Sequence, residues 1–395
     1  MAILPPMEAA TRRVRMTLRT EESVKPLELF FDLVFVLAIT QCTVLMADDP
    51  TWEGIARGLL VLGVLWWSWV GYSWLTSVVD PEEGIVRFAI FGAMAALLVV
   101  ALCVPEAFGD LGLLFACAYF VVRMGQVILL YNAGRGDPGL QRSASGLAVG
   151  TLLGTSILIG ASFTDGALQG ALWALALALD VGEPYVFGSE GWKLAPRHFA
   201  ERHGLIIIIA LGESIVSIGA GVEGEVDAGV VAAAVLGVGL AAGLWWLYFD
   251  IVALVAERRL TQATPGREQN EIARDSFSYL HFPMVAGIVL VALGLKKTLE
   301  HVEDPLKIEV AVAMLGGTAI YLLAHVAFRW RNVGRFSTQR LVAALVLLAL
   351  IPLATEIASL ATLAIVLAVL SVLIAYETVH FAELRERLRH QVEHG

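Results

Sequence analysis

A chain of 395 residues that is 58% hydrophobic and only 16% charged is too apolar for a soluble domain, where about 45–50% of residues are apolar and about 25% are charged. The net charge of −10, with no basic domain and no recognisable binding motif, gives no support to a nucleic-acid role. The apolar segments are long runs without strand-like alternation. They predict an all-α fold, a polytopic helical membrane protein, and not a β-barrel.

Turn residues and charges divide the chain into about 12 transmembrane helices, each close to the roughly 20 residues that a span needs. Their approximate ranges are 27–46, 54–78, 88–105, 111–131, 143–163, 167–187, 204–221, 228–253, 276–295, 308–328, 341–356 and 359–380. If both termini are cytoplasmic, most of the 27 Lys and Arg residues fall in cytoplasmic segments. We therefore expect a multi-pass protein of the bacterial inner (plasma) membrane, with the lipid bilayer as its surroundings.

The second half of the chain resembles the first. The stretch LVFVLAI at 33–39 matches LIIIIAL at 205–211, and the pair Trp66–Trp67 matches Trp245–Trp246. Farther along, the pair Tyr119 and Arg123 matches the pair Tyr321 and His325, with the same spacing. Six helices per repeat is an even number, so both halves enter the membrane from the same side and the repeats are parallel.

This repeat predicts a division of the chain into five parts. They are an N-terminal cytoplasmic segment (1–26), a first six-helix repeat (27–187), a cytoplasmic linker (188–203), a second six-helix repeat (204–380) and a cytoplasmic tail (381–395). The second half is expected to have the longer loops, notably at 257–275. The cysteines lie in or beside apolar segments without metal or disulfide spacing, so Cys42, Cys103 and Cys117 are interpreted as small buried hydrophobic residues.

Two carboxylates stand at the start of the first apolar run, PLELFFDLVFVLAI at 26–39. Glu28 and Asp32 are four residues apart and share a helix face. Pro26 suits a first helical position and an acid in the first turn complements the helix dipole, so Glu28 is interpreted mainly as a cap. Asp32 lies one turn deeper, and we expect it to bind an ion or to form an ion pair.

The stretch PRHFAERHGLIIIIALGESIV at 196–216 carries another buried acid. Its first charged residues are expected to lie at the cytoplasmic interface, where long side chains reach water: Arg197, His198, Glu201, Arg202 and His203. Glu213 follows Gly204 by nine residues, about 13 Å along a helix, which predicts a place near the middle of the bilayer. A carboxyl group there must pair with a cation or carry a proton.

Further ionisable residues fall within the predicted spans. Arg123 needs a carboxylate partner, for which Glu213 and Asp32 are the candidates, and a purely structural ion pair is the alternative. His281 is either a titrating switch or a neutral hydrogen-bonding group, and the nearby Pro283 can kink its helix and free a carbonyl. The remaining candidate site residues are His325 and Asp250, whereas three acids at helix ends are expected to be interfacial: Asp180, Glu183 and Glu377.

The combination of PLELFFDLVFVLAI, WALALALDVGEPY, RHFAERHGLIIIIALGESIV, WWLYFD and YLHFPMVAGIVLVALG resembles the bacterial low-temperature-requirement A (LtrA) family of membrane proteins. This resemblance implies a polytopic membrane protein associated with growth in the cold, and it implies no particular chemistry. Paired six-helix repeats with an acid in a Phe-rich first helix are also similar to the endolysosomal potassium and proton channel family, whose first helix carries Phe-Ser-Asp. Here the stretch reads Phe30-Phe31-Asp32, and His203-Gly204 stands where the motif should recur.

The function that these features favour is a secondary transporter or channel that moves protons, a cation or a small solute. Glu213 and Asp32 would bind the charge, and Arg123, His281 and His325 would tune or gate them. A membrane-embedded enzyme acting on lipid or envelope precursors and a non-conducting lipid-binding scaffold are the alternatives. No nucleotide-binding, metalloprotease or serine-hydrolase motif occurs, so no reaction is specified and no cofactor or metal is expected. The oligomeric state is left open, a homodimer included.

Overall fold

The computed structural model describes residue 19 and residues 23–82, 84–186, 188, 191–222 and 225–382. Most of the predicted N-terminal segment (1–26) and nearly all of the predicted tail (381–395) lie outside the described residues. Within them, the chain is built from helices joined by short connections. The predicted all-α class of a polytopic membrane protein is confirmed.

The first half contains α1 (Pro26–Asp48), α2 (Trp52–Val78), α3 (Gly84–Cys103), α4 (Gly112–Ala133), α5 (Pro138–Ala161) and α6 (Gly166–Val186). The second half begins with α7 (Pro196–Ala220), α8 (Ala228–Phe249), α9 (Val252–Gln262) and α10 (Arg267–Ile272), and a π-helical segment (Ala273–Tyr279) leads into α11 (His281–Glu300). It ends with α12 (Ile308–Ala311), a second π-helical segment (Val312–Gly316), α13 (Gly317–Val333), α14 (Thr338–Ala349), α15 (Ile351–Ala354) and α16 (Ser359–His380).

Among the described residues, 10 helical segments are long and apolar enough to cross a membrane. Two of the 12 predicted spans do not reach that standard. The first is α6, whose apolar run is interrupted by Asp180 and Glu183. The second is α14, which has only 12 residues and ends at a turn before Pro352, where α15 begins. The long loop predicted at 257–275 is wrong, because α9, α10 and the first π-helical segment occupy most of it.

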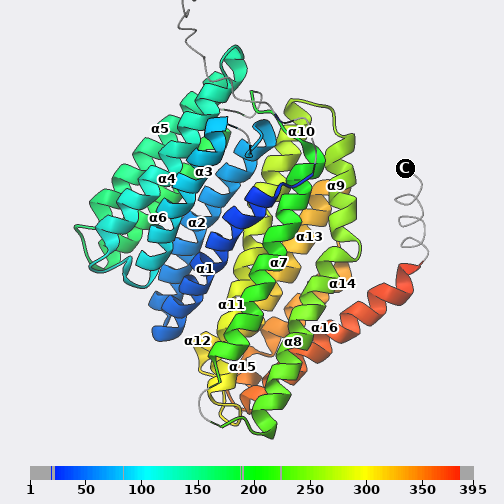
Figure 1. Cartoon of the computed structure of the whole chain (residues 1–395). Coiled ribbons are helices and arrows are strands. Elements are labelled where there is room, and N and C mark those ends of the chain that lie inside the picture. Colours follow the sequence, from blue (N-terminus) through cyan, green and yellow to red (C-terminus); the bar gives the residue numbers. More distant parts are fainter. Residues whose placement is uncertain are drawn as a thin grey trace, which may run out of the picture.

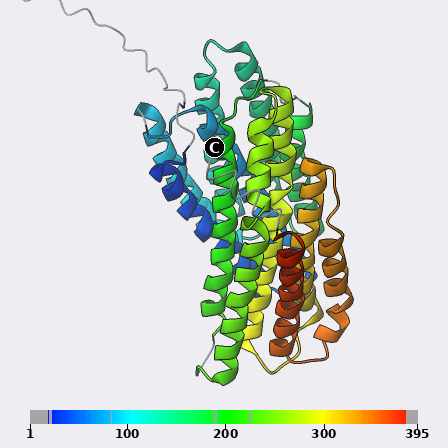
Figure 2. The same cartoon turned by 90° about the vertical axis from the view of Figure 1, so that its right-hand side faces the viewer.

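The long helices run side by side, and α1 packs directly against α7 (Figures 1 and 2). Helices α2 to α6 lie on one side of this pair, whereas α8, α13, α14 and α16 lie on the other (Figure 1). The start of α1, the end of α2 and the start of α7 meet at one end of the bundle, since Arg202 contacts both Glu28 and Thr76. We call this the arginine-rich end. The opposite end, where α1 ends and α2 begins, is the far end.

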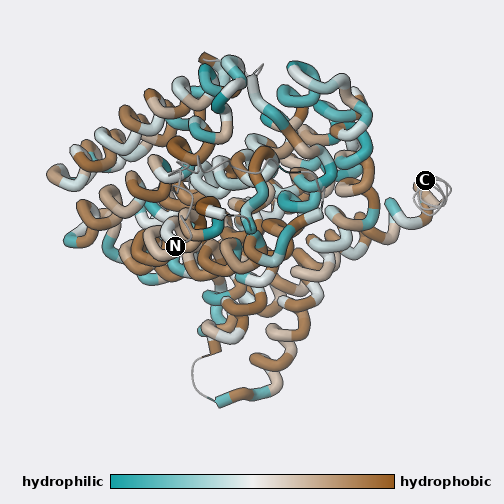
Figure 3. Tube along the Cα trace, turned by 45° about the horizontal axis from the view of Figure 1, so that its top comes forward, coloured by the Kyte–Doolittle hydropathy of each residue, from teal (hydrophilic) through white to brown (hydrophobic). Residues whose placement is uncertain are grey.

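The molecule is apolar outside and carries charges inside, the reverse of a soluble protein. Hydrophobic residues cover most of the long helices, while hydrophilic ones gather around α9 and α10 at the arginine-rich end (Figure 3). Exposed apolar side chains include Phe88 at 71% and Val379 at 81%, whereas Glu28 and Arg202 are buried. Cys42 and Cys103 are buried as predicted, but Cys117 is exposed on the outer face of α4, so its predicted burial is wrong.

A surface contact joins the two halves at the arginine-rich end. Asp137 caps the start of α5 by accepting the backbone N–H groups of Gly139 and Leu140. Lys193, in the segment that leads to α7, lies 2.7 Å from the same carboxylate. The hydrogen bond from Lys193, together with the one from the Leu140 N–H, lowers the pKa of Asp137.

The first π-helical segment leads into a proline that leaves a carbonyl free. Pro283 has no N–H with which to continue the backbone hydrogen bonding of the helix. The carbonyl of Ser278, five residues earlier, instead accepts a 2.8 Å hydrogen bond from Nε1 of Trp66. Trp74 donates to the Ser278 hydroxyl as well, so two indole groups hold α2 against the π-helical segment that precedes α11.

Corresponding helices of the predicted repeats have corresponding neighbours. Helix α1 packs against α2 and α3, as α7 packs against α8 and α11. The hydroxyl of Tyr119 on α4 donates to the backbone of Val64, and that of Tyr321 on α13 donates to the backbone of Leu244. These parallels accord with two repeats that enter from the same side, although the repeat and its domain boundaries stay a prediction.

The close approach of α11 and α13 generates a first testable prediction. A Cβ atom added at Gly287 would lie 2.6 Å from the backbone oxygen of Gly317, which no side-chain movement can relieve. Gly287→Ala should therefore lower the free energy of unfolding by about 1–3 kcal/mol, measured as a lower thermal midpoint in detergent. The matched control is Gly92→Ala, where nothing lies within 4 Å of the added atom. An unchanged midpoint for Gly287→Ala would show that the crossing is looser than described.

Candidate functional site

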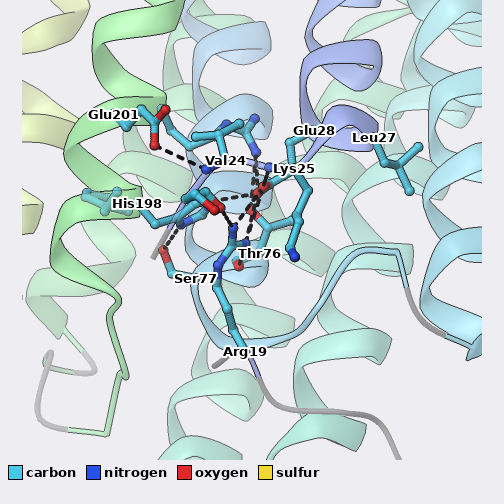
Figure 4. Close-up of polar contacts among 12 residues, drawn as sticks. Arg19, Val24, Lys25, Leu27, Glu28, Thr76, Ser77, His198 and Glu201 are labelled. Atoms are coloured by element: carbon cyan, nitrogen blue, oxygen red, sulfur yellow. Dashed lines mark hydrogen bonds and ion pairs between the residues drawn. The ribbon is translucent and has the colours of Figure 1, made fainter. Parts of the chain in front are cut away.

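The first buried ion network is built around Glu28 (Figure 4). This carboxylate accepts the backbone N–H of Lys25 at 2.8 Å, so the predicted cap is present. It also lies 3.2 Å from Arg19, 2.7 Å from Nε2 of His198 and 3.1 Å from Arg202. Its side chain is 1% exposed. Glu28 is therefore the centre of a charge network as well as a cap, which the interpretation as mainly a cap missed.

Asp32 completes this network one turn deeper on α1. Its Oδ1 atom accepts Nη2 of Arg202 at 2.7 Å and Nε1 of Trp69 at 2.9 Å, while Oδ2 has no hydrogen-bond partner. The Arg202 guanidinium also lies over the Trp69 ring, 5.5 Å from its centroid. Arg202, His198 and His203 are each 0% exposed. These three side chains therefore do not reach water as expected, whereas Arg197 and Glu201 are exposed.

The sequence spacing explains how this network forms. Glu28 and Asp32 share one face of α1 because they are four residues apart, and His198 and Arg202 share one face of α7 for the same reason. With α1 and α7 side by side, the two faces meet. If His198 is neutral, two carboxylates and two guanidinium groups balance, which satisfies the requirement that buried charges be paired. The predicted ion pair of Asp32 is thus present, with Arg202 as the cation.

A second buried network joins α4 to α6. Nη2 of Arg123 lies 3.2 Å from Oδ1 of Asp180, and its Nη1 donates to Gln126 at 2.9 Å. The hydroxyl of Tyr119 donates to the other Asp180 oxygen at 3.2 Å. Neither Glu213 nor Asp32 is the partner of Arg123, so that prediction is wrong.

Asp180 and Glu183 are each 5% exposed, so their side chains are turned into the protein and away from water, while their interfacial level stays a prediction. They lie three residues apart on the face of α6 that packs inward, and one oxygen of Glu183 has no hydrogen-bond partner. Glu377, the third acid expected at an interface, is 7% exposed and forms a bidentate ion pair with Arg340.

Glu213 differs from the other buried acids because hydroxyl groups hold it. Thr40 of α1 donates to Oε2, and Ser217 of α7 donates to Oε1 at 2.8 Å. No Lys, Arg or His of the described chain lies within ion-pair distance of this carboxyl, which is 2% exposed. Because α7 begins at Pro196 and not at Gly204, Glu213 lies about 25 Å along the helix. It is therefore closer to the far end than predicted.

Two buried histidines of the second half, on α7 and α11, lie side by side where this half meets α2 of the first half. The rings of His203 and His281 lie 5.2 Å apart, and His203 also packs edge-on against Trp69. Nδ1 of His281 lies 2.9 Å from the backbone oxygen of Ser276, and its Nε2 lies 2.8 Å from the Tyr248 hydroxyl. This is the geometry of a neutral imidazole that donates through Nδ1 and accepts through Nε2.

His325 and Asp250 lie outside both ion networks. Nδ1 of His325 lies 2.8 Å from the backbone oxygen of Tyr321, and its Nε2 has no hydrogen-bond partner. Asp250 is half-buried at the end of α8, where the chain turns into α9. Among the described residues, no group of three or more His, Cys, Asp or Glu side chains is suited to hold a metal ion.

Several residues of the networks were not among the sequence candidates: Arg19, Trp69, Asp180, His198 and Arg202. A signal for two of them was present. The four-residue spacing of Glu28 and Asp32 recurs in His198 and Arg202, and the predicted repeat aligns these two helices in parallel. Charges of opposite sign within two residues of the matching positions of two parallel helices predict an ion pair.

A bundle of apolar helices that encloses paired charges defines the class: a multi-pass membrane protein. A family model described as bacterial low temperature requirement A protein (LtrA) matches residues 23–375. The chain therefore belongs to the LtrA family. It is 32% identical over 309 residues to an uncharacterized protein of Rhizobium meliloti (strain 1021), which covers 75% of this chain and 74% of the relative. No solved structure matches the chain.

The Arg123–Asp180 pair provides a second testable prediction. Asp180→Asn leaves the guanidinium buried without a counter-charge and should cost about 3–5 kcal/mol of stability. The double variant Arg123→Met/Asp180→Leu removes both charges and should recover most of that loss. Thermal midpoints in detergent for Arg123→Met, Asp180→Leu and the double variant give the coupling. Additive losses would mean that the two residues do not interact.

Arg202 yields a third prediction. Lysine keeps the positive charge but cannot reach Glu28, Asp32 and Thr76 at once, because it has a single ammonium group in place of a planar fork. Arg202→Lys should therefore destabilise the protein by about 1.5–3 kcal/mol. Arg331→Lys, at a partly exposed pair with Asp275, is the control and should change stability by less than about 1 kcal/mol. Equal losses of stability for Arg202→Lys and Arg331→Lys would contradict the description of Arg202 as bonded to three partners at once.

Proposed function

We propose that the protein is a secondary transporter or channel coupled to protons, with Glu213 as the group that binds and releases the proton. The observation that carries the proposal is the surroundings of Glu213. A buried carboxylate without a cation at ion-pair distance is costly, whereas a protonated carboxyl bound by hydroxyl groups is not. Thr40 and Ser217 supply such hydroxyls from two different helices.

The other buried charges support different roles for the remaining candidates. Asp32 and Arg123 are held in ion pairs at 2.7 Å and 3.2 Å, so they would position helices and not exchange protons. The rings of His203 and His281 pack together, His281 bonds to Tyr248, and His203 packs against Trp69 of the first half. We propose that they form part of the path, since neutral imidazoles can pass a proton from one nitrogen to the other.

The distribution of basic residues supports an orientation. The arginine-rich end gathers Arg19, Arg202, Arg274, Arg331 and Arg340. By the positive-inside rule we assign this end to the cytoplasm, with both termini there, in the inner membrane of a bacterium. Glu213 would then lie closer to the outer side.

Proton flux into proteoliposomes tests the proposal and is the fourth prediction. A pH-sensitive dye trapped inside should report flux for the unaltered protein under an imposed gradient. Glu213→Gln should lower the rate by at least about tenfold, because the amide cannot release a proton. Thr40→Val should lower it less, since Ser217 remains.

The matched control is Glu303→Gln, an exposed carboxyl in the connection between α11 and α12. This variant should retain the rate of the unaltered protein. Equal rates for Glu213→Gln and Glu303→Gln would contradict the role of Glu213. Absence of flux in the unaltered protein across pH, potassium and sodium gradients would favour the second candidate, a non-conducting lipid-binding scaffold. What supports that candidate is the closed character of the two ion networks, whose charges all have partners.

A further inference from the structure

A cavity of about 250 Å³ opens at the arginine-rich end, away from both ion networks. It lies where the start of α9, the end of α13, the start of α14 and the end of α16 come together. Most of its wall is apolar, with Ile251, Val255 and Phe328 among the lining residues. A cavity between spans with apolar walls is suited to part of an amphiphilic molecule.

Two polar atoms in this cavity have no partner. Nε2 of His325 and Oγ of Ser337 are buried without a hydrogen bond, and both residues are 1% exposed. Because Nδ1 of His325 is held by the Tyr321 carbonyl, the neutral ring offers Nε2 as an acceptor. Buried polar atoms are normally satisfied, so this pair indicates a ligand that brings a hydroxyl group.

The cavity also carries one unbalanced positive charge. Arg340 and Glu377 neutralise each other through two hydrogen bonds of 2.9 Å and 2.8 Å. Arg329 lines the cavity as well and lies over the ring of Phe381. Within the described residues it has no carboxylate at ion-pair distance. An anion is therefore the complementary ligand.

An apolar groove adjoins the cavity on the outer side of the bundle. It has a volume of about 670 Å³ and runs along α14 and α16 between residues such as Val342, Val346 and Val372. The groove begins at Thr338, the neighbour of Ser337 in the chain, so the start of α14 borders both hollows. This groove faces the side where acyl chains lie.

We propose that the cavity and the groove together bind one anionic phospholipid whose headgroup carries hydroxyls, of which phosphatidylglycerol is the test case. The phosphate pairs with Arg329, and the glycerol hydroxyls donate to Nε2 of His325 and bond to Ser337. One acyl chain follows the groove between α14 and α16. The site does not include Glu213, so the lipid-binding proposal can be tested independently of the proposed transport.

The chemistry discriminates against other membrane lipids. A choline headgroup has no hydroxyl to donate to His325 and adds a positive charge beside Arg329. Glycerol phosphate without acyl chains has the headgroup chemistry but leaves the groove empty, so it should bind much more weakly.

Native mass spectrometry of the purified full chain, with stepwise addition of phosphatidylglycerol or phosphatidylcholine, tests the site and is the fifth prediction. Phosphatidylglycerol should be retained at one molecule per chain at least about tenfold more tightly than phosphatidylcholine. Arg329→Gln should weaken its binding by about tenfold or more, the effect of losing one charge-assisted contact. Ser337→Ala should weaken it by a smaller factor.

Two matched controls separate this site from general attraction of lipid to the protein. Arg87→Gln removes an exposed arginine at the start of α3 and should leave binding unchanged. Ala368→Trp fills the groove and should weaken binding, whereas Ala361→Trp on the same helix, also exposed but outside the groove, should not. Equal retention of the two lipids, or equal loss with Arg87→Gln and Arg329→Gln, overturns the proposal. Tight binding of glycerol phosphate alone would overturn the role of the groove.

Discussion

The structure depends on one buried arginine. Arg202 enters from α7 and reaches Glu28 and Asp32 on α1 together with Thr76 on α2, so a single guanidinium fastens three helices. A buried charge is tolerated only where its counter-charges are fixed, and here three elements fix one another. Since α1 and α7 are the pair on which the two halves meet, the same contact sets the register of one half against the other. The pair of histidines beside α2 and the place of Glu213 beside Thr40 follow from that register.

Five of the buried acids fall into two kinds, and Glu183, which is buried with one oxygen unbonded, fits neither. Glu28, Asp32, Asp180 and Glu377 each have an arginine partner, and such closed pairs serve to hold helices together. Glu213 is surrounded by hydroxyls, which bind a carboxyl in its protonated form as well as its charged form. The proton exchange that we propose at Glu213 would therefore break no ion pair. This contrast, and not the mere presence of acids in apolar helices, supports the assignment of different roles.

Much of the fold could be predicted from the sequence, because long apolar runs bounded by turn residues have few alternatives to membrane-spanning helices. The same reasoning failed at α6 and α9. Asp180 looked like a residue at a helix end, but its partner Arg123 comes from α4, and pairing between distant segments is not encoded in local pattern. The charged stretch at 257–275 looked like a loop because it is polar, yet an amphipathic helix at the end of a bundle is polar too. The expected position of Glu213 along its helix was wrong because the prediction began the helix at Gly204. Helix α7 begins at Pro196, and its first two turns are polar, so they did not look like part of an apolar span.

The central claim is that Glu213 carries a proton in the resting protein, and infrared spectroscopy of the carboxyl group measures this directly. A protonated carboxyl buried from water gives a C=O stretching band that shifts when the proton is exchanged for deuterium. The account predicts such a band in the unaltered protein at neutral pH and its loss in Glu213→Gln. A spectrum of the unaltered protein without this band, or a band that persists unchanged in Glu213→Gln, would contradict it.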